Sequence, residues 1–461
     1  MNIIIAGAGK VGSTLAEQLA VKEHNVTIID RSEDILHRLS RQLDVMCIKG
    51  NCATQNILRE AGVSDAHIVI AATDSDEINL LCCHCAHRMG TSYTVARVRG
   101  KEYTADVDTL KRDLGINLII NPESATAVEI SRLLRFPSVD HVDTFARGQV
   151  ELVSFRVQEQ DFLHGRALAS LSAKIRSLPI LFCAVERGDQ VVIPNGHFIL
   201  STGDKVHMAG TPSGIHQFFK VLGRSIQAVH TVFIIGGGRI THYLLEVLGH
   251  FGMRCKVVEK DEDCCRRLAE DFPQAIIIHG DGTDSQLLTE ERMEASDAFI
   301  ALTNRDEDNL IISLYAHQKG VSKVVAKSNR PNYTGIARSA GVESVVSPKL
   351  TTANQILRVV RGIQSSKGSV MTALYRIADG NAEAMEFLVG PDTHHLGTPL
   401  KDLRLKPGVL IAVIVRRGKI IIPEGSTALK EGDSVIVVAK DSGIMELNSI
   451  YLDSSRLGGI S

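Results

Sequence analysis

Short apolar runs alternate with amphipathic stretches of helical length over the first 120 residues or so of the chain. The apolar runs occupy residues 3–6, 26–29, 45–48, 68–72 and 94–98, and helical patterns begin at about Lys10 and Ser32. Strand-sized runs separated by amphipathic helices are typical of a parallel sheet with helical crossovers. The sequence therefore predicts a doubly wound α/β lobe at this end of the chain.

The chain repeats itself after about 230 residues. Residues 2–9 correspond to 231–238, 27–30 to 256–259, and 72–79 to 302–309. A second, β-rich part repeats more faintly, with its clearest match between 187–206 and 417–435. We predict an α/β fold made by tandem duplication, in which a Rossmann-like parallel-sheet lobe is followed each time by a smaller β-rich α+β lobe.

The predicted parts follow one another without a long flexible linker. They are a first Rossmann-like lobe at 1–121, a connecting helix at 122–139, a first β-rich lobe at 140–227, a second Rossmann-like lobe at 228–347, a connecting helix with a linker at 348–369, and a second β-rich lobe at 370–455. Pro122 and Pro348 suit the first turn of the two connecting helices. The segment 364–369, with three serines and a glycine, is the predicted mobile joint.

A glycine-rich turn joins the first strand to the first helix. Gly7, Gly9 and Gly12 fit the spacing in which the first glycine turns the chain, the second admits a pyrophosphate and the third lets helix and strand pack closely. Asp30 follows 23 residues after Gly7, at the end of the second strand, where a carboxylate can accept the ribose hydroxyls of an adenosine. The pattern favours NAD over NADP, and ATP or ADP would suit Asp30 equally well.

The second repeat carries a variant of this turn. Gly236, Gly237 and Gly238 precede Thr241, which stands at the third glycine position, and Glu259 follows 23 residues after Gly236. A β-branched side chain at that position is expected to push the helix away from the strand. The second pocket is then looser, or suited to another ligand, or it retains the fold without a ligand.

Polar residues end the fourth and fifth strands, at the edge where parallel sheets hold ligands. They are Thr73, Asp74, Arg97 and Arg99 in the first repeat, and Thr303, Asn304 and Lys327 in the second. An arginine at this edge can fork onto phosphate oxygens, and the alternative is a solvent-exposed salt bridge. Both interpretations of Arg97 remain open at this point.

Composition excludes several classes of protein. Fifty-one basic and 53 acidic residues give a net charge of −2, and with no tryptophan and 4% aromatic residues the chain lacks the features of nucleic-acid binding. No apolar stretch approaches the ~20 residues that span a bilayer. The chain opens directly on a strand-like run, without a secretory signal, and its nine cysteines fit a reducing compartment, so we expect a cytoplasmic location.

Residues 82–87, Cys-Cys-His-Cys-Ala-His, resemble a metal site because Cys83 and His87 share a helix face. The corresponding segment of the second repeat, 312–317, contains no cysteine, so we favour packing or a subunit contact. The pair His394 and His395 is a still weaker metal candidate. We therefore assign no metal site.

No constellation of catalytic residues stands out. A dehydrogenase needs a positioned acid or base over the nicotinamide, and the β-rich parts offer few titratable groups. Lone histidines such as His67 and His141 leave an NAD-dependent oxidoreductase as the alternative to a protein that is not an enzyme.

The doubled glycine turn, the two acids, the segments 73–79 and 303–309 and the two β-rich tails resemble the TrkA family, over essentially the whole chain. TrkA proteins are cytoplasmic regulatory subunits of Trk potassium-uptake systems, built from tandem RCK (KTN) units. The resemblance implies dimers and tetramers that form a gating ring beneath an integral membrane potassium-translocating subunit of the TrkH/TrkG type. Attachment to the inner membrane is then peripheral and occurs only through that protein partner.

The resemblance also implies that NAD(H), with ATP or ADP as alternative or additional ligands, changes the shape of the ring and hence potassium movement. By position, the first site is lined by Gly7, Ala8, Gly9, Lys10, Val11, Gly12, Asp30, Thr73, Asp74 and Arg97, and the second by Gly236, Gly237, Gly238, Arg239, Ile240, Glu259, Thr303 and Asn304. Thr241 departs from the family pattern, which leaves the occupancy of the second site open.

Overall fold

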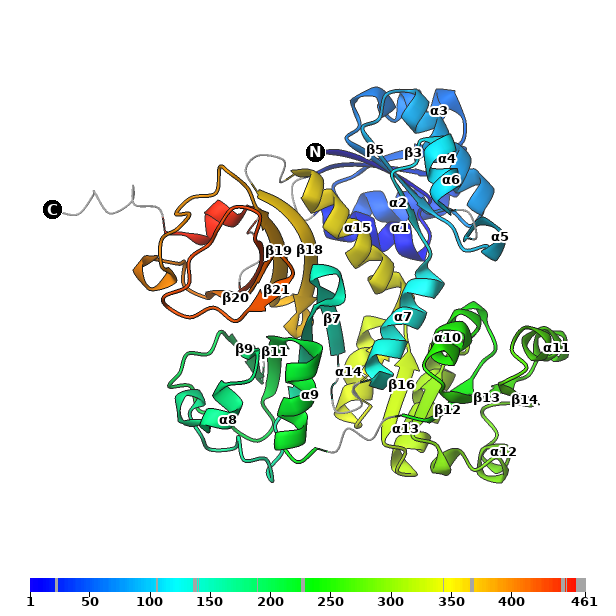
Figure 1. The fold of residues 1–461 in the computed structure, drawn as a ribbon. Coiled ribbons are helices and arrows are strands. Elements are labelled where there is room, and N and C mark those ends of the chain that lie inside the picture. The colour runs from blue at the N-terminus through cyan, green and yellow to red at the C-terminus, as the bar shows by residue number, and fades with distance from the viewer. Residues whose placement is uncertain are drawn as a thin grey trace. The chain divides into compact units, whose positions relative to one another are not determined.

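A computed structural model describes residues 1–20, 24–104, 107–135, 139, 141–188, 190–224, 229–342, 344–364, 369–440, 444 and 446–452. The chain forms two compact units (Figure 1). One unit combines Met1–Ser131 with His230–Leu357, and the other combines Arg132–Val229 with Arg358–Ser461. The first unit therefore contains the two Rossmann-like lobes and the second contains the two β-rich lobes. The sequence analysis does not predict this pairing of like lobes.

The first Rossmann-like lobe contains a six-stranded sheet in the order β3-β2-β1-β4-β5-β6, and each neighbouring pair is parallel. Its strands are β1 (Asn2–Ala6), β2 (Asn25–Asp30), β3 (Met46–Lys49), β4 (Ile68–Ala71), β5 (Tyr93–Arg97) and β6 (Leu118–Ile120). Its helices are α1 (Lys10–Ala20), α2 (Glu33–Gln42), α3 (Gln55–Glu60), α4 (Asp76–Arg88), α5 (Lys101–Thr104) and α6 (Val107–Leu114), with the 3₁₀ turn η1 (Val63–Asp65). The strand order reverses between β1 and β4, which is where such sheets open a crevice at their carboxyl ends.

The second Rossmann-like lobe repeats this sheet in the order β14-β13-β12-β15-β16-β17, again with parallel neighbours. Its strands are β12 (Thr231–Ile235), β13 (Arg254–Glu259), β14 (Ile276–His279), β15 (Ala298–Ala301), β16 (Lys323–Lys327) and β17 (Ser344–Val346). Its helices are α10 (Arg239–His250), α11 (Glu262–Asp271), α12 (Ser285–Glu290), α13 (Asp306–Gln318) and α14 (Pro331–Ser339), with the 3₁₀ turn η4 (Met293–Ala295). In Figure 1 the blue-to-cyan strand and helix alternation returns in green and yellow.

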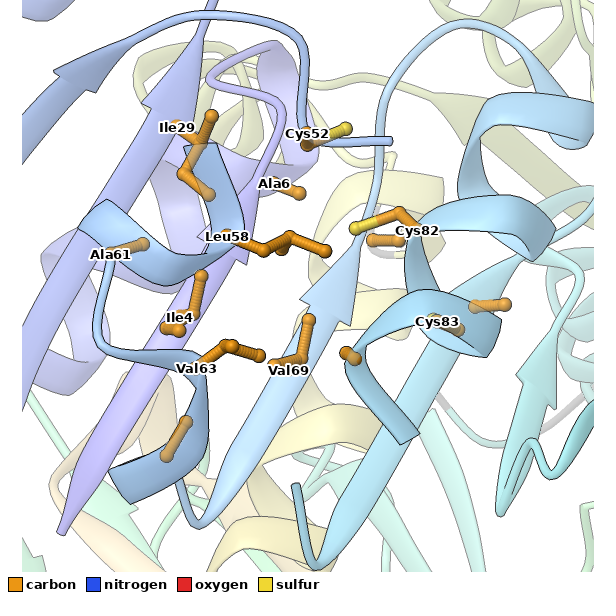
Figure 2. Close-up of a cluster of buried hydrophobic side chains, with 14 of the residues drawn as sticks. Ile4, Ala6, Ile29, Cys52, Leu58, Ala61, Val63, Val69, Cys82 and Cys83 are labelled. Atoms are coloured by element: carbon orange, nitrogen blue, oxygen red, sulfur yellow. The ribbon is translucent and has the colours of Figure 1, made fainter. Parts of the chain in front are cut away.

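Apolar side chains of β1, β2 and β4 meet helices α3 and α4 in a buried cluster on one face of the first sheet (Figure 2). It includes Ile4, Ala6, Ile29, Leu58, Val69, Cys82 and Cys83, all 2% exposed or less. Strands buried on both faces of a parallel sheet are apolar at nearly every position, which explains the continuous runs in the sequence. The cluster packs these strands against α3 and α4 and so supports the sheet whose edge carries the glycine turn.

The two β-rich lobes are antiparallel sheets in the orders β10-β9-β11-β8-β7 and β18-β19-β22-β20-β21. The first comprises β7 (His141–Phe145), β8 (Val150–Arg156), β9 (Ile180–Arg187), β10 (Gln190–Val192) and β11 (Lys205–Gly210), with α8 (Ala173–Arg176), α9 (Pro212–Val221), η2 (Ala146–Gly148) and η3 (Leu168–Ser170). The second comprises β18 (Ser369–Ile377), β19 (Ala382–Val389), β20 (Val409–Arg416), β21 (Lys419–Ile421) and β22 (Ser434–Ala439), with η5 (Ala378–Gly380), η6 (Leu400–Asp402) and η7 (Leu447–Ile450). The predicted fold class, a duplicated pair of parallel and β-rich lobes, is confirmed.

Helices begin at both prolines that the sequence analysis marks as helix starts. They are α7 (Pro122–Arg135) and α15 (Pro348–Gln364). Of the predicted mobile joint, residues 365–368 lie outside the described part of the chain. The exact limits of the six predicted parts remain predictions.

Glu151 on β8 gives a prediction for the pH dependence of stability. The residue is 2% exposed, and its Oε2 has no hydrogen-bond partner among the described residues. Burial raises the pKa of the Glu151 carboxyl, although Arg135 and Arg132 partly oppose this. The pKa of Glu151 is therefore higher in the folded chain than in the unfolded chain. Protonated Glu151 makes its full contribution to the free energy of unfolding below the pKa of the unfolded chain, and this contribution is lost as the pH rises through the pKa of the folded chain.

We therefore expect Glu151→Gln to raise the unfolding temperature by a few degrees at pH 7.5 and to leave it almost unchanged near pH 4. Thermal unfolding followed by circular dichroism at the two pH values measures this difference. An equal increase at both pH values would show that ionisation of Glu151 is not the cause.

Candidate functional site at the carboxyl edges of the parallel sheets

The turn after β1 requires glycine at its first and third positions. Gly7 has a φ of +100°, and a Cβ there would lie 2.8 Å from the backbone of Thr73 at the end of β4. A Cβ at Gly12 would lie 1.8 Å from the carbonyl oxygen of Gly7. Helix α1 therefore packs directly against the turn, and the turn packs against β4.

The middle glycine of the turn faces open space. Gly9 is exposed, and among the described residues, its two chain neighbours aside, no atom lies within 4 Å of a Cβ built on it. Lys10 beside it begins α1 and is also exposed, whereas Val11 is buried. The backbone at Gly9 is thus free for close approach by another group, at the amino-terminal end of a helix of 11 residues.

Asp30 at the end of β2 connects the turn to the next loop. Its Oδ2 accepts a hydrogen bond from the backbone N–H of Ala8 at 2.6 Å, and its Oδ1 accepts one from Ser32 at 2.8 Å. Each carboxylate oxygen has a further lone pair with which it can accept a hydroxyl. The sequence places the acid at this edge but gives no sign that it also binds the turn itself.

The second repeat reproduces this arrangement. Gly236 has a φ of +95°, and Glu259 accepts hydrogen bonds from Gly237 N–H at 2.6 Å and from Asp261 N–H at 2.9 Å. Gly238 is exposed, and apart from its chain neighbours no atom in the described part of the chain lies within 4 Å of an added Cβ. Beyond it, Arg239 begins α10 in solvent and Ile240 is buried. The open backbone position and the acid therefore occur twice.

Thr241 occupies the third glycine position of the second repeat and is fully buried. Its hydroxyl donates a hydrogen bond to the carbonyl oxygen of Gly236, the equivalent of the Gly7 oxygen that excludes a side chain at Gly12. The threonine therefore supplies a polar contact to the turn, which the sequence analysis misses. The looser second pocket remains a prediction.

A buried asparagine joins the ends of the fourth and fifth strands in each repeat. Asn79 Oδ1 accepts from Thr73 N–H at 2.8 Å and from the Thr73 hydroxyl at 2.7 Å, while its Nδ2 donates to the carbonyl oxygens of Thr73 at 3.1 Å and Arg97 at 2.9 Å. Asn309 makes the same four bonds to Thr303 and Lys327. Both asparagines are 0% exposed. The sequence analysis assigns them no role, although their recurrence in segments 73–79 and 303–309 is a signal for one.

Arg97 lies at the same edge in a largely buried position. Its side chain is 12% exposed, its Nη2 donates to the carbonyl oxygen of Thr73 at 3.0 Å, and it lies 3.8 Å from the carboxylate of the exposed Asp74. Its Nε has no partner among the described residues, and burial lowers the pKa of Arg97, as does Arg99 nearby. Arg97 is therefore largely buried and lies within ion-pair distance of an exposed carboxylate, and both interpretations, a contact with a phosphate and a salt bridge with Asp74, remain predictions.

In the second repeat the corresponding cation is Lys327, which is 8% exposed. Burial lowers the pKa of its ammonium, and Asp306 and Glu123 oppose that effect. Thr303 follows β15 by two residues, as Thr73 follows β4, and Asn304 is exposed like Asp74. The two edges therefore share the asparagine hydrogen bonds and differ in the basic side chain, a guanidinium at Arg97 and an ammonium at Lys327.

The histidine and cysteine candidates lie elsewhere. Cys82 and Cys83 are part of the core in Figure 2, and Cys83 donates to the carbonyl oxygen of Val95 at 3.3 Å. His67 accepts the N–H of Asn2 at 3.1 Å at the amino-terminal ends of β1 and β4, opposite the glycine turn. The side chain of His141 lies outside the described set.

His394 and His395 are exposed, and the ring of His395 packs against Tyr451 with centroids 4.7 Å apart. Within the described ranges, no three or more histidine, cysteine or carboxylate side chains are grouped as metal ligands would be. In the same part of the chain, no helix has both the length and the apolar character needed to cross a membrane.

Comparison with protein families gives two matches in each repeat. The TrkA-N domain matches residues 3–122 and 232–348, and the TrkA-C domain matches residues 152–223 and 384–451. Among curated proteins, the chain is 32% identical over 461 residues to the Trk system potassium uptake protein TrkA homolog 1 of Methanosarcina mazei, covering 98% of this chain and 100% of that protein. It is 32% identical over 446 residues to the Trk system potassium uptake protein TrkA of Halomonas elongata, covering 96% of each.

Solved structures share the fold at lower identity. The GsuK channel bound to NAD matches with a TM-score of 0.63 at 20% identity, covering 95% of this chain and 76% of that one. The isolated GsuK RCK domain gives the same score and identity, with 92% of that chain covered. GsuK bound to ADP matches with a TM-score of 0.51 at 16% identity, over 78% of this chain and 69% of that one.

Proposed function

The chain belongs to the TrkA family of Trk system potassium uptake proteins, and from that premise we propose that it is the regulatory, nucleotide-sensing subunit of its transport system. The observation that carries the proposal is the open backbone at Gly9, beside a carboxylate at the end of the next strand. The same pair recurs at Gly238 and Glu259. A backbone N–H cluster next to an acceptor for ribose hydroxyls suits a nucleotide.

The proposed ligands are NAD(H), with ATP or ADP as alternatives or additional ligands. Solved GsuK structures of the same fold are described as bound to NAD and to ADP, which supports this class. In this chain Gly9 would face the pyrophosphate, Asp30 would accept the ribose hydroxyls, and the guanidinium of Arg97, at the same edge, would lie near a phosphate. The negative charge of Asp30 disfavours a 2′-phosphate, so NAD is preferred to NADP.

The proposed mechanism is a shift between two conformations of a homotetrameric ring. A nucleotide moves that equilibrium only if it binds the two conformations with different affinity, and the difference is typically ~1–3 kcal/mol per coupled site. The hydrogen bonds of Asn79 and Asn309 join the ends of the fourth and fifth strands in each repeat, which would face the ligand. We propose that the ring lies on the cytoplasmic side of the inner membrane and acts on the potassium-translocating subunit.

An NAD-dependent oxidoreductase is the competing hypothesis. Its acid or base would have to reach the nicotinamide, and His67 lies at the opposite edge of the sheet. Incubation of the chain with NADH and common carbonyl acceptors, followed at the absorbance of reduced nicotinamide, tests this hypothesis. We expect no oxidation of NADH. Sustained oxidation would show that the chain is an enzyme and would contradict the proposed regulatory function.

We expect Asp30→Ala to weaken binding of NADH and ADP about 10–100-fold, because a charge-assisted acceptor for the ribose is lost. Isothermal titration calorimetry on the full chain measures the dissociation constants, and circular dichroism checks that the variant folds.

Asp30→Asn is the matched variant, because its amide oxygen can still accept one backbone N–H of the turn. Glu259→Ala reports in the same way on the second site. Unchanged dissociation constants in a folded Asp30→Ala protein would contradict the assignment of the first site, and an unchanged stoichiometry in Glu259→Ala would show that the second site does not bind these nucleotides.

A further inference from the structure

A groove of about 570 Å³ opens within the second unit, between the two β-rich lobes. Its lining includes Thr144 and Gln149 of the first repeat and Tyr375, Glu386, Val415 and Ser434 of the second. The Tyr375 hydroxyl donates to the Thr144 carbonyl oxygen at 2.8 Å, and its ring packs edge-on against Phe145 at 4.9 Å. Apolar side chains of both repeats continue into one buried cluster beside it. The walls are therefore part of a packed interface between the lobes.

Glu386 is a buried carboxylate in this groove, 8% exposed. Its Oε1 accepts from the hydroxyl of Ser434, and its Oε2 accepts from the backbone N–H of Ala146 at 3.1 Å. Both donors are neutral, and no lysine, arginine or histidine of the described residues forms an ion pair with Glu386. A buried carboxylate without a counter-charge is costly, so the groove favours a cation and disfavours an anion.

The first repeat has its own cation at the equivalent position. Lys205 on β11 lies opposite Glu186 on β9, with its Nζ 3.5 Å from Oε1, and the two side chains are 12% and 17% exposed. In the second repeat the corresponding cross-strand pair is Ser434 and Val415. The acid stands on the adjacent strand instead, as Glu386, where the first repeat has Ser154. Each β-rich lobe thus carries a carboxylate here on a different strand, and the two positions are not equivalent. In the first lobe Lys205 and His207 both lie beside the carboxylate, whereas no basic side chain of the described residues pairs with Glu386 in the second.

We propose that this groove binds an aliphatic primary ammonium ion, with the ammonium group next to Glu386 and Ser434. The hydroxyl of Thr372 and the amide of Gln149 also line the groove and offer further oxygen acceptors. Val415, Leu388 and Ala373 provide apolar surface for a short methylene chain. A volume of about 570 Å³ fits such a molecule better than a bare metal ion. The site is separate from the glycine turns and does not depend on the proposed nucleotide function.

The test is calorimetric titration of the full chain with pentylammonium chloride, in a buffer free of other amines. Pentanol and sodium pentanoate are probes of the same length without the positive charge, and KCl and MgCl₂ are the metal probes. We expect pentylammonium to bind and Glu386→Gln to weaken its binding at least about 10-fold, because a charged hydrogen bond is lost. Pentanol and pentanoate are expected to bind at least 10-fold more weakly than pentylammonium.

Ser434→Lys is the second variant, and it keeps the test decisive if Glu386→Gln fails to fold. It restores a tethered ammonium at the position that Lys205 holds in the first repeat, so we expect it to abolish pentylammonium binding and to raise the unfolding temperature. Ser434→Ala, which adds no charge, is its control and should retain binding within a few-fold. Binding that survives both charge-altering variants, binding of pentanol at equal strength, or binding of K⁺ or Mg²⁺ alone would overturn the proposal.

Discussion

Asn79→Ala is expected to lower the free energy of unfolding by about 3–4 kcal/mol, since its four hydrogen bonds to partly buried groups of Thr73 and Arg97 are lost together. The side chain is fully buried, so water cannot replace it without opening the edge of the sheet. We also expect weaker nucleotide binding, because Thr73 and Arg97 are held in place by this residue.

Urea denaturation of the full chain, combined with hydrogen exchange at the β4 and β5 amides, measures this loss in the first lobe, since a chain with two units need not unfold in one step. Asn309→Ala should give a similar loss in the second lobe. Asn56→Ala is the control, because Asn56 is exposed and should change stability by less than about 0.5 kcal/mol. A loss below about 1 kcal/mol for Asn79→Ala would contradict the proposed contribution of its four hydrogen bonds to stability.

Gly9→Ala is expected to leave folding unchanged and to weaken binding of NADH and ADP by at least about 100-fold. Its Cβ would lie more than 4 Å from every atom of the described residues other than the two flanking ones, so the folded chain accepts it. The methyl group would instead occupy the space through which a pyrophosphate reaches the backbone, at a cost of roughly two charge-assisted hydrogen bonds. Calorimetry measures the affinity, and thermal unfolding measures the stability of the same preparations.

Gly12→Ala is the control within the same turn, and we expect it to reduce stability where Gly9→Ala does not. Its Cβ would lie 1.8 Å from the Gly7 carbonyl oxygen, so we expect a loss of about 1–3 kcal/mol of stability. Gly238→Ala repeats the binding test in the second lobe, where an added Cβ also meets open space. Full affinity in Gly9→Ala would show that the ligand does not approach this backbone.

The sequence predicts the scaffold of the candidate site better than the roles of individual side chains. The spacing of Gly7, Gly9 and Gly12 and the position of Asp30 follow from local turn geometry and strand length, and the structure places them on one edge. The hydrogen bond from the Thr241 hydroxyl does not follow from the glycine spacing, because that spacing indicates only how large a side chain the turn admits. The backbone contacts of Asp30 were missed because they join residues 22 positions apart.

By itself the sequence determined the duplication, the alternation of strands and helices and the two turns, because periodicity and glycine spacing act over a few neighbouring residues. Tertiary structure decided which distant groups meet. It placed Asn79 against Arg97 across 18 positions, buried Arg97, and brought Glu386 to Ala146 across 240 positions. Such contacts depend on how the sheets and lobes pack, and no local pattern encodes that packing.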